Sequence, residues 1–524
     1  MAETEPEALA EIEGLLQLAR LGDFSRARHG IDQLVQAFGS NINILHKVGT
    51  IRQMNGQYDE AIAHYLRVLE IEPNFHYTEI ELGNTYHAMG RNEEALRWYE
   101  KAIASNPSYV LSYQRAAAMR RDLGDHHGAA ALLTKALAVE PGNQKIAGEL
   151  AVGLVYLNRR DDAVEALAPI VHAPGASQEH IVTFMRLLTE TGAYGRLIEF
   201  VAGLPAAAST YLRFHAELGA GHARLARAYD RDATIATATA REAAPAWRDT
   251  AGVLAELRGA VRNRTPFSLI RLGDGEARFL AFMDPATRRV MSNAEAGTMM
   301  DSIWHNWFGQ PHGAFNGYDL TFLNAAVIRS IERASVIGVP KAARLAIDRQ
   351  HFGYLAYLEG LMAHMLHDTP GRLCADASVP VDLHRESPFL GEVLSDARFV
   401  GVVGPHAELP ARIAARFGIP RTAFYGVPGE RRLPTHLINK SDRHFPDRYR
   451  EILRDLVVPE PGAIFLVAAG LLGKVYCARI HELGGIAIDI GSLADGWMGY
   501  GRDTRPGQFK GNEADWVLPP IAAG

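Results

Sequence analysis

The stretch "LGNTYHAMGRNEEALRWYEKAIASNP", residues 82–107, decides the fold of the N-terminal part of this chain. Its small residues are spaced for a close approach of two helices, and its large ones are spaced to fill the gap between neighbouring helix pairs. The small residues are Gly83, Ala95 and Ala102, and the large ones are Leu82, Tyr86 and Tyr99. Gly90 predicts the turn between the two helices, and Pro107 predicts the end of the second helix.

The same pattern recurs along the chain with a period of 34 residues. The turn residue recurs as Gly22, Gly56, Gly90, Gly124, Asn158 and Gly192. Alanine follows five positions later, as Ala27, Ala61, Ala95, Ala129 and Ala163, with Leu197 at the sixth step. Proline recurs as Pro73, Pro107 and Pro141. Three residue types in one phase predict stacked helix pairs, which bury apolar faces that a single pair leaves exposed.

This period and these residues resemble the tetratricopeptide repeat, over roughly residues 8–205. The resemblance implies a solenoid whose concave groove binds a peptide or protein, or associates with a second copy in a homo-oligomer. The alternative is that the array is only a spacer or a dimer surface. The sequence does not indicate which peptide the groove would recognise.

The composition describes an ordinary globular chain. Its 524 residues are 48% hydrophobic and 22% charged, which suits about three domains with sizeable cores. The 54 Lys+Arg against 60 Asp+Glu give a net charge of -6, which disfavours a globally basic nucleic-acid binder. Cys374 and Cys477 lie outside any paired motif, so we expect neither a disulfide framework nor a structural zinc site.

We expect a soluble, cytoplasmic protein with no membrane span. Residues 1–13 are acidic and lack the basic-then-apolar order of a secretory signal. The longest apolar run, Ala463–Gly473, is too short to cross a bilayer.

From Pro266 onward, short apolar runs alternate with helical patterns. The predicted strands are Phe267–Leu272, Ala334–Val339, Arg398–Gly404, Arg421–Val427, Ala463–Ala468 and Gly485–Ile490. The predicted helices include Leu320–Arg333, Leu409–Phe417, Asp447–Leu456 and Leu471–Leu483. The alternation predicts an α/β domain with a mainly parallel sheet, in which ligands bind at the carboxyl ends of the strands. The expected regions are a solenoid over 1–205, an Ala- and Arg-rich helical linker or cap over 206–262, and the α/β domain over 263–524.

The first strand end reads "SLIRLGDGE", residues 268–276, and displays two carboxylates. Gly273 and Gly275 flank Asp274 and free the backbone for a turn and for close approach of a ligand. Asp274 and Glu276 are spaced to share one hard cation, and Arg271 is placed to meet a phosphate or either acid. The alternative is a surface turn before a helix whose N-terminus Glu276 favours.

The second strand end, "FLVAAGLLGK" at residues 465–474, predicts a glycine turn followed by a helix. Gly470, Gly473 and Lys474 suit a diphosphate cradled by backbone N–H groups and met by the lysine charge. The Walker A pattern fails at Ala468 and Val475, which excludes a P-loop ATPase or GTPase. The alternative is that the small residues only allow close packing of helix on strand.

The third strand end places Asp489 in a buried apolar strand, where it needs a partner: a ribose, a base or backbone. A charged stretch at 440–449 predicts a solvated loop or a phosphate or acceptor site. His384, His406 and His444 are candidate proton acceptors, although a lone histidine is more often structural.

Four blocks together resemble the GT-D-type glycosyltransferases, bacterial sugar transferases with a Rossmann-like fold, from about Pro266 to Arg505. The blocks are "SLIRLGDGE", "SDRHFPDRY", "LVAAGLLGKVYCARIHELGGIAIDIGS" and "DGWMGYGRDTR". The family's Asp-x-Glu motif falls on Asp274 and Glu276, which implies a divalent ion, typically manganese with magnesium as the alternative, beside the diphosphate of a UDP-sugar. Lys474, Asp489, Asp495 and Arg505 also match family-like blocks.

The leading hypothesis is a metal-dependent glycosyltransferase whose tetratricopeptide groove presents a protein acceptor. The ion would neutralise charge on the leaving diphosphate, and His384 or His444 is the candidate base for an inverting attack by the acceptor hydroxyl. A second hypothesis makes the acceptor a polysaccharide or a lipid-linked glycan, with the repeats recruiting other enzymes. A third is a non-catalytic scaffold with a sugar-nucleotide-binding domain. The sequence does not predict the sugar, the nucleotide base or the stereochemistry.

Overall fold

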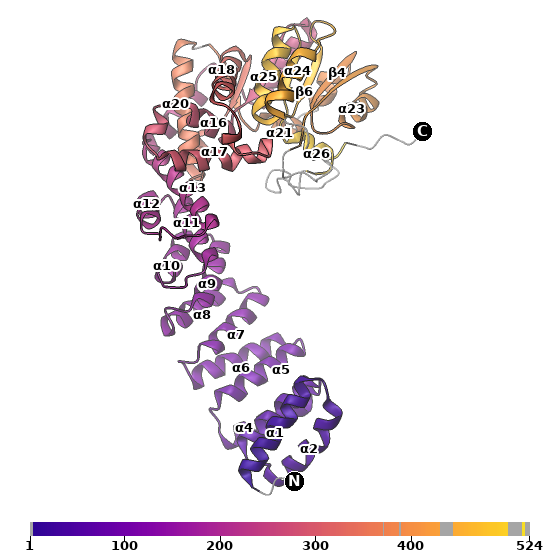
Figure 1. The fold of residues 1–524 in the computed structure, drawn as a ribbon. Helices are drawn as coiled ribbons and strands as arrows, with labels where there is room; N and C mark the ends of the chain where they lie inside the picture. Colours follow the sequence, from indigo (N-terminus) through magenta and orange to yellow (C-terminus); the bar gives the residue numbers. More distant parts are fainter. Residues whose placement is uncertain (1–3, 370, 387–388, 430–443, 501–515, 519–524) are drawn as a thin grey trace. The chain divides into compact units, whose positions relative to one another are not determined.

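The computed structural model of the chain describes residues 4–369, 371–386, 389–429, 444–500 and 516–518 (Figure 1). The chain forms two compact units, Met1–Leu187 and Leu188–Gly524. Helix α11 (Gln178–Thr191) carries the chain from the first unit into the second. We describe each unit by itself.

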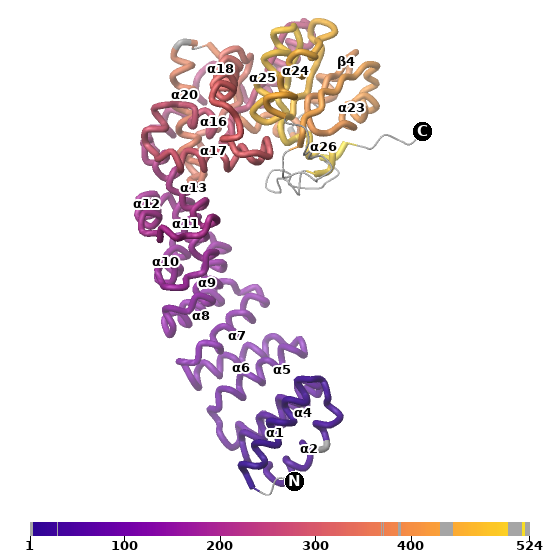
Figure 2. The backbone as a smooth tube through the Cα atoms, in the orientation of Figure 1, coloured from indigo at the N-terminus to yellow at the C-terminus, as the bar shows by residue number. Residues whose placement is uncertain are grey.

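The first unit is built of antiparallel helix pairs that follow one another along the chain (Figure 2). The helices before α11 are α1 (Glu5–Arg20), α2 (Phe24–Phe38), α3 (Ile42–Met54), α4 (Tyr58–Ile71), α5 (His76–Ala88), α6 (Asn92–Ser105), α7 (Val110–Asp122), α8 (His126–Val139), α9 (Gln144–Tyr156) and α10 (Arg160–Val171). Each helix packs on the next, so the repeat predicted from the 34-residue period is confirmed.

The 34-residue series of turn residues has a single conformational cause. Its members adopt positive φ angles at the turn within each helix pair, from φ +83° at Gly22 to +77° at Gly192. Asn158 takes the same conformation at φ +60°, which asparagine tolerates better than other residues with a side chain. Each of these residues therefore has a left-handed backbone conformation, which ends the first helix of a pair and turns the chain into the second.

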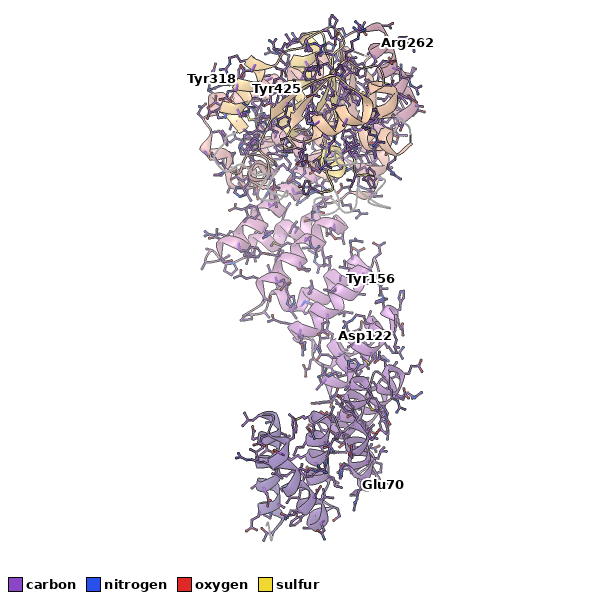
Figure 3. The ribbon with its side chains drawn as sticks, turned by 90° about the vertical axis from the view of Figure 1, so that its right-hand side faces the viewer. Glu70, Asp122, Tyr156, Arg262, Tyr318 and Tyr425 are labelled. Atoms are coloured by element: carbon purple, nitrogen blue, oxygen red, sulfur yellow. The ribbon has the colours of Figure 1, made fainter. Side chains whose placement is uncertain are left out.

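The small residues of the repeat set the distance between its helices. A Cβ atom added to Gly83 on α5 would lie 2.5 Å from the ring of Tyr99 on α6, and Gly49 meets Tyr65 in the same way one repeat earlier. Tyr65 and Tyr99 are fully buried there. Outside these contacts, Val152 and Tyr156 of α9 lie one turn apart and are exposed; Tyr156 is labelled in Figure 3.

The second unit begins with helices and continues into an α/β domain. Its strands are β1 (Phe267–Arg271), β2 (Val336–Val339), β3 (Leu373–Asp376), β4 (Phe399–Gly404), β5 (Arg421–Gly426), β6 (Ile464–Val467) and β7 (Ile486–Asp489). Its α-helices are α12 (Tyr194–Ala202), α13 (Thr210–Arg227), α14 (Arg231–Glu242), α15 (Thr250–Asn263), α16 (Asp274–Met283), α17 (Asn293–Phe308), α18 (Gly317–Arg333), α19 (Ala342–Ile347), α20 (Phe352–Asp368), α21 (Val379–Glu386), α22 (Phe389–Leu394), α23 (Leu409–Phe417), α24 (Tyr449–Asp455), α25 (Gly470–Glu482) and α26 (Leu493–Trp497). Helix α13 packs on α17 and α20, and α15 packs on α21 and α22.

The strands form one sheet in the order β3-β2-β1-β7-β6-β4-β5, and every described pairing is parallel. The six predicted strands are confirmed, with ends displaced by one or two residues. Sequence reasoning missed β3 because its four residues, Leu-Cys-Ala-Asp, lack the β-branched side chains that mark the other strands.

Helices cover both faces of the sheet, and successive strand residues serve the two faces in turn. Ile270 belongs to a core with helices that include α16, α17, α18, α20 and α25. Its neighbour Leu269 belongs to a second core with α15, α21, α22, α23 and α26. This double coverage explains why the strands read as continuous apolar runs rather than as alternating ones.

Candidate functional site

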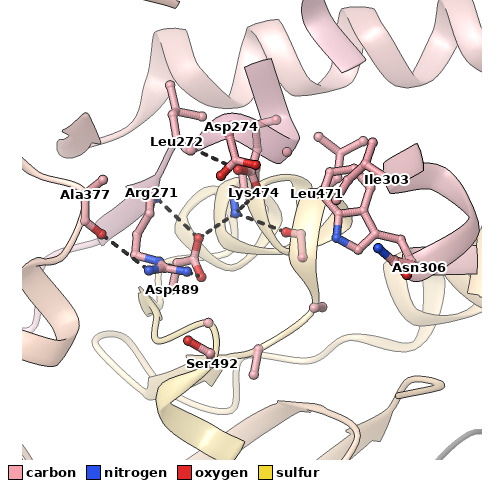
Figure 4. Close-up of a pocket in the computed structure, with 18 of the residues that line it drawn as sticks. Arg271, Leu272, Asp274, Ile303, Asn306, Ala377, Leu471, Lys474, Asp489 and Ser492 are labelled. Atoms are coloured by element: carbon pink, nitrogen blue, oxygen red, sulfur yellow. Dashed lines mark hydrogen bonds and ion pairs between the residues drawn. The ribbon is translucent and has the colours of Figure 1, made fainter. Parts of the chain in front are cut away.

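A cavity of about 820 Å³ lies at the carboxyl ends of the strands. All seven strands contribute residues that follow them, so the cavity has the position expected for ligands in an open parallel sheet. The order of the strands also reverses next to β1: β2 and β3 lie on one side of β1, and β4 to β7 lie on the other side. Most of the predicted site residues follow β1, β6 and β7, and the structure brings them together here (Figure 4).

Asp274 and Glu276 lie in the first turn of α16, so the alternative of a surface turn before the helix is wrong, although Glu276 does lie at the helix N-terminus. Helix α16 starts at Asp274 because the backbone N–H of Gly273 donates to Glu276 Oε2 at 3.0 Å, which caps the helix. The two side chains consequently have different surroundings: Asp274 is 32% exposed in the cavity, whereas Glu276 is buried behind it.

Three cationic or proton-bearing groups face Asp274. Arg278 Nη2 and Arg344 Nη2 each lie 3.5 Å from its carboxylate, and His351 Nε2 lies 4.0 Å away. Burial raises the pKa of Asp274, but Arg278, His351 and Arg344 together outweigh that and hold it below its ordinary value. Asp274 is therefore an ionised carboxylate at neutral pH.

Behind Asp274, Lys474 connects two buried carboxylates. Its Nζ lies 2.8 Å from Glu276 Oε1 and 2.9 Å from Asp489 Oδ2, and it also donates to the carbonyl of Gly470 at 3.1 Å (Figure 4). Burial lowers the pKa of Lys474, but the charges of Asp489 and Glu276 exceed that effect and raise it. Lys474 lies one turn inside α25 and faces these two acids.

Arg271 closes the β1 side of the cavity. Its backbone N–H donates to Asp489 Oδ2 at 3.3 Å, and its Nη1 donates to the carbonyl of Ala377 at 3.3 Å. Asp489 thus accepts bonds from backbone and from Lys474, which is the partnering that its buried position required. A Cβ on Gly491 would lie 2.1 Å from Arg271 Nη2, and its φ of +49° also favours glycine there.

The predicted glycines surround a tryptophan that sequence reasoning did not single out. A Cβ on Gly275 would lie 2.6 Å from the Trp307 ring, and one on Gly470, where φ is +52°, would lie 3.3 Å from its Nε1. Gly473 packs on Val467 of β6, which matches the close-packing alternative for the second strand end.

The histidines have unequal positions. His444 lines the cavity but is buried, with Nε2 3.2 Å from the Tyr476 hydroxyl, and burial lowers its pKa to about 3. His384 is outside the cavity lining; its Nδ1 accepts from Trp497 Nε1 at 3.3 Å, and its ring stacks on Trp516. His406 pairs with Asp495 at 2.8 Å, and Asp495 lines the cavity. Arg505 and residues 440–443 lie outside the described residues.

Sequence reasoning missed the residues that follow β2. Lys341, Arg344 and His351 line the cavity, and Asp348 holds His351 with a 2.9 Å contact to Nδ1. The sequence does contain a signal for them, because β2 is one of the predicted strands and its carboxyl end lies beside that of β1.

The described residues hold no group of three or more His, Cys, Asp or Glu side chains arranged to bind a metal ion. In the same part of the chain, no helix has the length and hydropathy needed to cross a bilayer.

Comparison with known protein families identifies both units. Residues 40–108 and 120–180 match tetratricopeptide repeat models, and residues 248–433 match a GT-D fold-like domain. The chain therefore joins an N-terminal tetratricopeptide solenoid to a GT-D-like α/β domain. This domain supports the assignment of the chain as a glycosyltransferase.

Similar proteins extend the comparison for the repeats. The chain is 28% identical over 126 residues to the Hsp70-Hsp90 organizing protein of Triticum aestivum, and 31% identical over 104 residues to the peroxisomal targeting signal receptor of Kluyveromyces lactis. These segments cover 24% and 20% of this chain, and they span only 20% and 18% of those relatives.

Solved structures similar to the chain include MamA, at 20% identity and a TM-score of 0.27, and pilF of Pseudomonas aeruginosa, at 16% identity and a TM-score of 0.30. They cover 29% and 40% of this chain, and 90% and 98% of their own.

Proposed function

We propose that this chain transfers a sugar from a nucleotide-diphosphate sugar, a UDP-sugar in the first instance, to a protein acceptor held by the tetratricopeptide groove. The observation that carries the proposal is the cavity at the seven strand ends of the GT-D-like domain, with the ionised Asp274 on its wall.

The cavity is large enough and charged appropriately for a nucleotide diphosphate. Its volume of about 820 Å³ falls in the range of small-molecule sites, roughly 300–1,000 Å³. Arg271, Lys341 and Arg344 line it and are partly exposed, so their charges are placed to meet phosphate oxygens. Such fixed positive charges stabilise the negative charge that develops on a leaving diphosphate.

The donors present fit a divalent ion at Asp274. Its carboxylate is ionised, reaches the cavity, and has only long contacts of 3.5 Å to arginine. Both oxygens of Glu276 already accept bonds, one from Gly273 and one from Lys474, so Glu276 would contribute through its remaining lone pairs or through a bridging water. When bound, manganese or magnesium supplies Lewis-acid neutralisation of the diphosphate.

The buried charges behind Asp274 keep it in place. Lys474 compensates Glu276 and Asp489, and Glu276 caps the helix that Asp274 begins. These residues therefore act on the reaction by positioning Asp274. The candidate bases of the sequence analysis receive little support, because a pKa of about 3 makes His444 a weak proton acceptor at neutral pH and because His384 lies away from the cavity.

A protein acceptor is favoured by the repeats, since tetratricopeptide arrays commonly bind other proteins. A polysaccharide or lipid-linked acceptor, with the repeats recruiting other enzymes, is the second candidate. A non-catalytic scaffold that only binds the sugar nucleotide is the third.

The test measures hydrolysis or transfer with several UDP-sugars, in the presence of manganese and in EDTA. We expect turnover with manganese only, and we expect Asp274→Ala to lose at least a hundredfold in kcat/KM while its thermal unfolding stays cooperative. Full metal-dependent turnover by Asp274→Ala would show that the site is elsewhere. Binding of UDP-sugar without any turnover would favour the scaffold.

A further inference from the structure

We propose that His351, oriented by Asp348, is a protein ligand beside Asp274 for the divalent ion of the transferase. This inference rests on the proposed function and adds a residue from a second strand end. The family-like Asp-x-Glu motif does not contain this residue, because His351 follows β2 whereas Asp274 follows β1.

Asp348 fixes the position of the imidazole ring. Its Oδ1 lies 2.9 Å from His351 Nδ1 and accepts the backbone N–H of His351 at 3.1 Å. Arg344 Nε lies 3.3 Å from Asp348 Oδ2 and gives this carboxylate a cationic partner. Because a carboxylate only accepts hydrogen bonds, Nδ1 donates to Asp348, and Nε2 is the ring nitrogen that faces Asp274. Histidine ligands of metals are commonly held in this way by a carboxylate.

Nε2 is directed at Asp274, with 4.0 Å between it and Asp274 Oδ2. Two ligands that each lie about 2.1–2.2 Å from one ion are separated by roughly 3 to 4.3 Å, depending on the angle between them. The observed separation falls in that range.

Two protein ligands leave most of the coordination shell to other groups. The described residues provide no third His, Cys, Asp or Glu in a metal-binding arrangement, so phosphate oxygens and water must complete the shell. Arg271 and Lys341 also line this cavity, and their positive charges suit such a diphosphate. We therefore expect the ion to bind weakly alone and at least tenfold more tightly with a nucleoside diphosphate.

The nitrogen ligand also predicts the choice of metal. Magnesium prefers oxygen ligands and retains its waters, whereas manganese is a transition metal and binds an imidazole nitrogen more readily than magnesium does. An Asp–His pair should accordingly prefer manganese to magnesium, and His351→Asp should reduce that preference.

The experiment is pulsed electron paramagnetic resonance on the full chain with Mn²⁺ and UDP, which detects a directly bound nitrogen. We expect a ¹⁴N coupling in the parent protein that is absent from His351→Ala. The same samples give Mn²⁺ affinity by calorimetry: we expect a loss of at least tenfold in His351→Ala and of 10- to 100-fold in Asp348→Asn. His364→Ala, an exposed histidine of the same α20 region, should change neither readout.

A parent spectrum without nitrogen coupling, although Mn²⁺ is bound, overturns the proposal and leaves His351 as a counter-ion of Asp274. If UDP does not bind, the donor assignment fails, and the measurement is repeated with Mn²⁺ and inorganic diphosphate. A nitrogen coupling there supports the ligand, and its absence overturns it. Thermal unfolding of each variant verifies that a lost signal reflects the site and not the fold.

Discussion

At the scale of single residues, Lys474 shows how the cavity wall depends on charge compensation. Its side chain is 2% exposed and is the common partner of Glu276 and Asp489. Lys474→Met removes the ammonium and leaves two buried carboxylates uncompensated, which should lower the free energy of unfolding by about 3–5 kcal/mol. Urea unfolding monitored by tryptophan fluorescence measures this change in the free energy of unfolding. The fluorescence reports mainly on the second unit, because five of the six tryptophans lie there.

The matched control is Arg454→Met, which breaks an ion pair with Asp455 at the surface and should leave the urea midpoint unchanged. Adding Glu276→Gln and Asp489→Asn to Lys474→Met removes the unpaired charges and should recover part of the loss. Equal urea midpoints for Lys474→Met and the parent protein would mean that the contacts of Lys474 with Glu276 and Asp489 contribute nothing to stability.

His222 connects a single side chain to the pH dependence of stability. It is buried on α13, with Nε2 3.3 Å from the carbonyl of Arg349, and burial lowers its pKa to about 3. The unfolded chain binds a proton near pH 6.5, but the folded chain does not until about pH 3. The stability that the neutral ring provides is therefore fully present above pH 6.5 and is lost as the pH falls.

His222 contributes at most about 1.4 kcal/mol per pH unit to the slope of the free energy of unfolding against pH. His222→Phe keeps an aromatic ring and cannot be protonated, so its unfolding free energy should fall less steeply between pH 6.5 and 4. The exposed His364→Phe serves as the control and should keep the parent slope. Parallel pH profiles for all three proteins would contradict the assignment.

At the scale of elements, the glycines of the solenoid differ in what they do. Gly83→Ala places a methyl group 2.5 Å from Tyr99 and should destabilise the first unit by about 1–3 kcal/mol. Gly153 lies in α9 with no atom within 4 Å of an added Cβ, so Gly153→Ala should stabilise by about 0.5–1 kcal/mol. Circular dichroism of the variants during urea unfolding measures both changes, and equal shifts would contradict the packing argument.

Most elements followed from the sequence because their signals are local. Glycine at intervals of 34 residues indicates the left-handed turns, and short apolar runs in the sequence indicate strands such as β6. The short edge strand β3 was missed because it forms through pairing with β2, a non-local interaction. At the site, Asp274 and Lys474 were found from their strand ends, but the partnership of Lys474 with Glu276 depends on side-chain geometry that spacing does not encode.

At the scale of the whole molecule, the two units should be separable in function. A variant that starts at Ser177, just before α11, lacks the solenoid helices α1–α10 but keeps the sheet and both of its cores. We expect it to retain hydrolysis of the sugar donor within about threefold and to lose transfer to a protein acceptor. Retained protein transfer would indicate that the acceptor is recognised by the second unit.

The position of β1 in the sheet determines when the chain can first bind a ligand in the cavity. The first strand of the sheet pairs with the last one, Phe267 with Ile486, at the centre of the sheet, and the cavity lies over their ends. A nascent or truncated chain that lacks β7 therefore has no central pair, no Asp489 and no complete cavity. Ligand binding would then stabilise only chains that contain β7. A ligand at a hundred times its dissociation constant would raise the free energy of unfolding of those chains by about 2.7 kcal/mol. A ligand of the cavity would in this way protect chains that contain β7 and leave chains without β7 unprotected.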